Sequence, residues 1–132
     1  MNTKEWDRKD EWRKRGRNFL VTVSRHTVKS LSDSFEGENR WAVYVYVYPK
    51  HPHFASFEGS DMWQDAASMM PLHGGPSYLQ RHYDEDGTTA SIQVGSDYHH
   101  LHDDFTFYST QQEAWRIFMD ADDLFNWMES RA

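Results

Sequence analysis

One eight-residue segment, residues 97–104, holds three histidines and three aspartates and is the densest group of ligands, acids and bases in the chain. In an extended backbone alternate side chains share a face, so His100, His102 and Asp104 can point the same way. Two neutral imidazoles and a carboxylate form a ligand set that suits zinc, manganese or iron. The segment therefore contains a candidate divalent-metal site.

Three interpretations of this segment stay open. In a metal-dependent hydrolase acting on a phosphate or amide substrate, His99 or Asp103 would be the general base on a metal-bound water. Without a metal, the same side chains can line a pocket for a polar ligand. They can also cap one another in a surface loop, anchored by Tyr98 and Leu101. No catalytic residue is assigned, and binding is favoured over catalysis.

A second candidate site lies at the glycine pair that follows a histidine. Glycines let a ligand approach the backbone closely and present N–H groups to an anion. A site there, facing the histidine segment, would suit a nucleotide-like ligand, whereas a plain tight turn is the alternative. The predicted ligand-binding residues are His73, Gly74, Gly75, Arg81, His82 and Tyr98.

Composition limits the class of protein. The chain has 132 residues, enough for one domain with a single core, and 16% of them are aromatic. It has no cysteine, which excludes disulfides and cysteine-based zinc sites. No apolar run is long enough to cross a membrane, so we expect a cytoplasmic protein with no membrane partner and no resident cofactor other than a divalent metal.

Charge is distributed unevenly along the chain. Residues 1–17 hold seven basic and four acidic side chains, whereas residues 18–132 hold seven basic and seventeen acidic ones. Because residues 18–132 are acidic, they repel phosphate backbones, so general nucleic-acid binding is not expected. The basic arm over residues 1–17 is the exception. We predict a basic N-terminal helix or arm over residues 1–17 and a single domain over residues 18–132.

The apolar spacing predicts an α+β fold. It consists of a mostly antiparallel sheet of about four strands, a long C-terminal helix that covers the sheet, and a short N-terminal helix. A capping-box pattern at Thr110-Gln111-Gln112-Glu113 precedes the C-terminal helix. The predicted strands cover residues 19–28, 40–48, 78–83 and 90–94, and a further short helix is predicted over residues 61–70.

The strand at 40–48 has two different faces. Val43, Val45 and Val47 share one face, and Tyr44, Tyr46 and Tyr48 share the other. Single-strand binders stack bases on such faces, in a basic groove, but here only Arg40, Lys50 and Arg81 are near in sequence. We therefore expect the tyrosine face to pack under the helix or against a second subunit. Since large apolar patches are rare on monomers, a homodimer is predicted, with the tyrosine face or the N-terminal helix in the contact.

Four runs in the chain resemble a family of small tailed-bacteriophage proteins to which no activity is assigned. They are RWAVYVY at 40–46, YPKHP at 48–52, PLHGG at 71–75 and QVGSDYHHLHD at 93–103. The resemblance covers residues 18–129 and implies a bacterial host cytoplasm. We therefore expect an accessory protein that binds a host or phage protein, with a small polar ligand or the metal-dependent hydrolase as alternatives.

Overall fold

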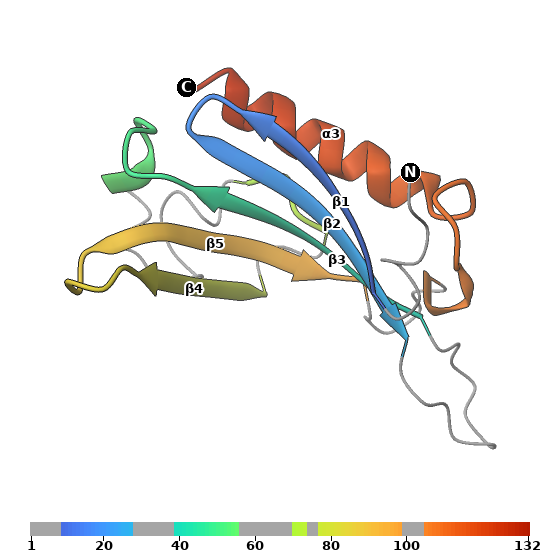
Figure 1. Ribbon diagram of the computed structural model, residues 1–132. Coiled ribbons are helices and arrows are strands. Elements are labelled where there is room, and N and C mark those ends of the chain that lie inside the picture. The colour runs from blue at the N-terminus through green and yellow to red at the C-terminus, as the bar shows by residue number, and fades with distance from the viewer. Residues whose placement is uncertain (1–8, 28–38, 56–69, 74–76, 99–104) are drawn as a thin grey trace.

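The computed structural model describes residues 9–27, 39–55, 70–73, 77–98 and 105–132 (Figure 1). Its centre is a five-stranded sheet in the order β1-β2-β3-β5-β4, in which every neighbouring pair is antiparallel. The elements are β1 Lys9–Gly16, β2 Phe19–Thr27, β3 Asn39–Val47, β4 Tyr78–Tyr83, β5 Thr89–Asp97, the 3₁₀ helix η2 Phe105–Phe107 and the helix α3 Trp115–Glu129. The predicted α+β class is confirmed, and the described residues form one strand more than the four expected.

The additional strand is β1, and it corrects the predicted N-terminal helix over residues 9–16, while residues 1–8 lie outside the described residues. Residues 9–16 pair with β2 along the whole of β1, through a two-residue turn at Arg17 and Asn18. Asn18 has a φ of 62°, in the left-handed region that asparagine tolerates better than most residues. In this hairpin Trp12 packs its partly buried ring against the core.

Alternation along β2 and β3 builds the core on one face of the sheet. Directly opposed pairs, such as Val21 with Val45 and Val23 with Val43, are buried on this face. β5 adds Ile92 to the same layer. The valine face of β3, and not its tyrosine face, therefore packs under the helix, which corrects one of the two expected positions for the tyrosines.

The helix α3 lies against β1, β2 and β3 on the valine side (Figure 1). Its buried side chains are Ile117, Ala121, Leu124 and Met128, spaced as one helical face. The predicted capping box forms only in part and in the turn before the helix, since the N-cap of α3 is Ala114, which makes no side-chain cap. The Glu113 amide donates to Thr110 Oγ1 at 3.1 Å, and the Thr110 hydroxyl donates back to Glu113 Oε1 at 3.2 Å.

The predicted hairpin over residues 78–94 is also confirmed, as β4 and β5 with an acidic turn between them. Asp84 and Asp86 accept hydrogen bonds from the Thr88 amide in this turn, each at 3.0 Å. The helix predicted over residues 61–70 lies outside the described residues except for Met70. Within the described ranges, no helix has the length and apolar character needed to cross a bilayer.

Candidate functional site

The face of the sheet turned away from α3 is the first candidate ligand surface, and we call it the open face. It carries the even-numbered side chains of β3, β4 and β2 together with the odd-numbered ones of β1 and β5, because directly opposed residues share a face. Its members include Glu11, Arg13, Thr22, Ser24, Tyr44, Tyr46, Tyr78, Gln80, His82, Gln93 and Asp97. Within the described residues, no helix or strand packs on this face.

One row of opposed residues crosses the whole open face. It runs from Arg13 through Thr22, Tyr44 and Gly95 to Tyr78. A Cβ at Gly95 would lie 2.4 Å from the Tyr44 ring, so the ring can lie over this position only because glycine has no side chain. The Tyr44 and Tyr78 rings then meet edge to face, with centroids 5.3 Å apart.

A second row places Tyr46 beside polar side chains. Tyr46 is opposite Gln93, whose Oε1 lies 2.8 Å from His82 Nε2, and the Tyr46 and His82 ring centroids are 6.0 Å apart. Tyr78 donates its hydroxyl hydrogen to Gln80 in the same area. The face therefore combines half-buried aromatic rings with amides and an imidazole that can donate or accept hydrogen bonds.

The charged groups of β1 reach the tyrosines on this face. A hydrogen bond and ion pair with Glu11 hold the pKa of Arg13 above its usual value, and the Tyr46 and Tyr48 phenols add to the effect. Burial is the main cause that raises the pKa of Tyr44 and of Tyr46, so both phenols stay neutral near pH 7. The Arg13 side chain is 68% exposed, which leaves its charge available to a ligand.

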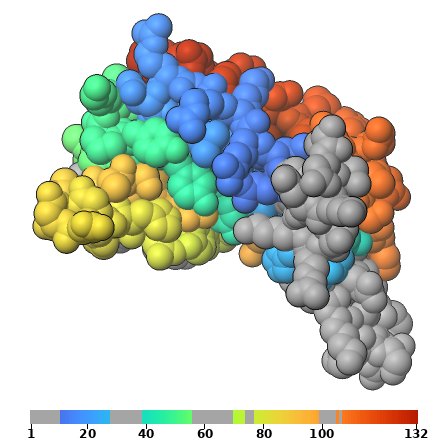
Figure 2. All heavy atoms as spheres, in the orientation of Figure 1, coloured from blue at the N-terminus to red at the C-terminus, as the bar shows by residue number. Residues whose placement is uncertain are grey.

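The middle of the open face is hollow. A depression of about 600 Å³ is lined from four strands, and the residues around it include Thr22, Ser24, Tyr44, Tyr46 and Gln93. Figure 2 shows the strands spread over this side of the molecule, with the helix confined to the upper edge. A hollow of that size is within the range of pockets that hold small ligands or side chains of a partner.

A second candidate site gathers two of the predicted ligand-binding residues, and we call it the His73 cleft. The His73 ring stacks on Tyr98, with centroids 4.4 Å apart and planes 10° apart, and Phe105 packs edge-on against both rings. Tyr98 is 1% exposed and donates its hydroxyl hydrogen to Asp120 Oδ2 at 2.7 Å. Tyr98, within the histidine segment, and Phe105, directly after it, therefore both lie beside His73.

The cleft itself has a volume of about 370 Å³ and is bordered by Leu72, His73, Arg116, Asp120 and Asp123, among others. Two carboxylates and one guanidinium make its charge mixed. Nothing in this arrangement selects one ligand class.

The structure does not bring Arg81 and His82 to this cleft. His82 is opposite Ser91, seven residues before Tyr98, which corresponds to roughly 24 Å along an extended strand. Arg81 is opposite Ile92, on the side of the sheet that faces the core, so the two neighbours do not share a face.

The remaining predicted site residues lie outside the described residues. They are Gly74 and Gly75, the metal ligands His100, His102 and Asp104, and the candidate general bases His99 and Asp103. In the part of the chain that the structure describes, no group of three or more histidines and carboxylates is arranged to hold a metal ion. The metal site and the hydrolase remain predictions.

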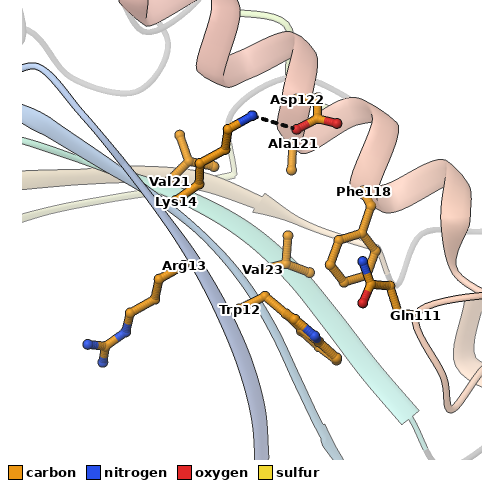
Figure 3. Close-up of a pocket in the computed structure, with 9 residues that line it drawn as sticks. All are labelled: Trp12, Arg13, Lys14, Val21, Val23, Gln111, Phe118, Ala121 and Asp122. Atoms are coloured by element: carbon orange, nitrogen blue, oxygen red, sulfur yellow. Dashed lines mark hydrogen bonds and ion pairs between the residues drawn. The ribbon is translucent and has the colours of Figure 1, made fainter. Parts of the chain in front are cut away.

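A third cavity lies between β1 and α3, with a volume of about 270 Å³ (Figure 3). Trp12 forms its floor, stacked on Trp41 with centroids 5.6 Å apart and meeting Phe118 edge-on at 4.9 Å. Lys14 reaches across to Asp122, with Nζ and Oδ1 3.3 Å apart. Figure 3 also shows Arg13 directed away from the helix, which places it on the open face.

No protein-family model matches the chain, and no curated protein or solved structure matches it either. A functional proposal therefore rests on the geometry of the described residues.

Reasoning from the sequence identified the tyrosine face of β3 but favoured packing under the helix or against a second subunit. It assigned Arg13 to a helix, so the arginine and the tyrosines were never placed on one face. The signal that could have linked them is the turn sequence Gly16-Arg17-Asn18, because glycine and asparagine are typical of tight hairpins.

Proposed function

We propose that this protein is a binding module whose ligand surface is the open face of its sheet. The observation that carries the proposal is the hollow of about 600 Å³, bordered by Tyr44 and Tyr46 and lined from four different strands. Tyrosine and arginine are the side chains that most often dominate binding energy at protein surfaces, because they combine area with hydrogen bonding.

A rigid base supports this role. β2, β3 and β5 lie in the interior of the sheet, and their opposite face packs into the core. Side chains held on such strands keep their positions when a ligand binds, which reduces the entropy lost on association. The open face also lacks the arrangement of nucleophile, base and orienting group that catalysis requires among its described residues, so binding is the simpler proposal.

We propose a bacterial host cytoplasm as the setting, as the bacteriophage resemblance implies. The ligand is then a molecule of the host or of the phage, and a host or phage protein is the class predicted from the sequence.

The experiment compares capture by three immobilised proteins: the wild type, Tyr46→Glu and Met119→Glu. The first substitution places a charge in the hollow, and the second places the same charge on the exposed outer side of α3, where Met119 is 52% exposed. We expect bacterial-lysate ligands retained by the wild type to be lost with Tyr46→Glu and kept with Met119→Glu. Equal retention by all three proteins would contradict the proposal, once circular dichroism has shown that each is folded.

A further inference from the structure

We propose that the open face binds single-stranded nucleic acid, with bases stacked on its tyrosine rings and phosphates held by the basic side chains that β1 carries on this face. This inference rests on the proposed function and names the ligand class of the same face. It reverses the expectation from net charge, because the fold separates charges that the overall value of −7 averages together.

The separation of charge follows from the strand order. Residues 9–27, which form the β1–β2 hairpin, hold six basic and two acidic side chains, a net of +4 over both faces. By strand register Arg13 and Arg15 belong to the open face, whereas Lys14 and Arg25 belong to the helix side. The helix α3 holds one basic and four acidic side chains, a net of −3, on the other side of the sheet. A further acidic group, Asp84-Glu85-Asp86, lies in the turn of the β4–β5 hairpin, and β4 is the strand farthest from β1. A polyanion is therefore attracted more strongly to the β1 edge than to α3 or to the β4–β5 turn.

The aromatic rings favour nucleic acid over an acidic protein surface. Every base has a π-face, so half-buried rings beside a basic edge form a stacking platform that tolerates any sequence. Tyr44, Tyr46 and Tyr78 supply three rings on adjacent rows, and the hollow beside them has room for splayed bases. Ser24, a half-buried residue at the hollow, offers a hydroxyl group to base edges, whereas Thr22 and Gln93 line the hollow but are buried.

The two carboxylates on the face fit bases better than phosphates. Asp97 lines the hollow on β5, away from the β1 edge, where a carboxylate can accept a hydrogen bond from a base amino group. Glu11 lines the hollow beside Arg13 and is paired with it. Glu11 therefore limits the pull of that arginine on a phosphate, and Glu11→Gln should raise the affinity.

The test is fluorescence anisotropy with labelled single-stranded DNA and RNA of about 12 nucleotides, within the ~4–16 that one single-strand-binding fold occupies. We expect both strands to bind at low salt and a duplex of the same sequence to bind more weakly. Tyr46→Ala should weaken single-strand binding by about 5- to 150-fold, the equivalent of one lost stacked base. Trp115→Ala, which removes a ring that is 56% exposed on α3, should leave the affinity unchanged.

A second pair of variants tests the phosphate contact without touching a half-buried ring. Arg13→Gln should reduce the slope of log affinity against log salt concentration by about 0.7, the value for one phosphate on a single strand. Lys14→Gln is the matched control, because this neighbouring side chain pairs with Asp122 on the helix side. It should leave the slope unchanged.

Absence of single-strand binding at low salt would overturn the inference, as would equal effects of Arg13→Gln and Lys14→Gln. If no oligonucleotide binds but Tyr46→Glu still abolishes the capture of a protein from lysate, the open face is a protein-binding surface and only the inference fails. If neither occurs, the inference and the proposed function fail together.

Discussion

Removing the Tyr98 hydroxyl should destabilise the protein by a measurable and assignable amount. Tyr98→Phe keeps the ring that stacks on His73 and deletes only the donor to Asp120 Oδ2. A hydrogen bond to a charged group contributes about 1.5–3 kcal/mol. Because Asp120 is only partly buried, water can replace the lost donor. We therefore expect a loss near the lower limit, about 1.5 kcal/mol.

Urea denaturation followed by circular dichroism measures this loss. With an m-value of about 1.5 kcal/mol/M, the midpoint should fall by about 1 M. Tyr83→Phe is the control, because Tyr83 is 61% exposed and its hydroxyl should contribute less than about 0.5 kcal/mol.

A double-mutant cycle with Asp120→Asn measures the part of this interaction that depends on the carboxylate charge. Asparagine keeps an acceptor oxygen and removes the charge, so the cycle should give a coupling energy of about 1 kcal/mol between Tyr98 and Asp120. A coupling energy near zero, or a Tyr98→Phe midpoint equal to that of the wild type, would refute the claim that this hydrogen bond stabilises the His73 cleft.

Four further predictions concern the rest of the fold. Gly95→Ala should destabilise by about 1–3 kcal/mol in urea, because its methyl group would lie 2.4 Å from the Tyr44 ring. Leu124→Ala removes a fully buried side chain of α3 and should cost about 2–5 kcal/mol in the same assay. His51→Leu should lower the free energy of unfolding by about 1–3 kcal/mol in calorimetry. The substitution removes the imidazole Nε2 that lies 3.2 Å from the Met128 carbonyl oxygen. Hydrogen bonds within the hairpin turn lower the pKa of Asp86 from 3.8 to about 2. The contribution of Asp86 to stability is therefore complete above pH 3.8 and is lost as the pH falls towards 2. Asp86→Asn should flatten the curve of stability against pH in that interval.

The strands and the helix with strong periodicity were predictable from the sequence. β3 alternates valine and tyrosine from Val43 to Val47, and α3 places Ile117, Ala121 and Leu124 on one face. Local pattern was sufficient there because each element buries a single regular stripe.

β1 could not be predicted in the same way. Six of its eight residues are charged, and Trp12 is its one large apolar side chain. Its conformation is decided by pairing with β2, which depends on the turn at Asn18 and on a core that the local sequence does not describe.

The candidate site also combines predictable and unpredictable parts. His73 and Tyr98 are 25 positions apart in the sequence, and their proximity is predicted because both belong to segments rich in polar ligands. The placement of Arg13 and Tyr46 on one face could not be predicted, since it arises from three strands lying side by side. Sequence spacing can identify residue types suited to a site, but only strand order places distant ones on one face.

Site-specific photocrosslinking tests the central claim, that the open face is the ligand surface, most directly. A benzophenone amino acid is placed at Tyr46, in the hollow of the open face, at His73, in its cleft, or at Met119, on the outer side of α3. After irradiation in bacterial lysate, we predict adducts to nucleic acid or protein with the probe at position 46 and none with the other two. Adducts at position 73 or 119, with none at position 46, would contradict the account.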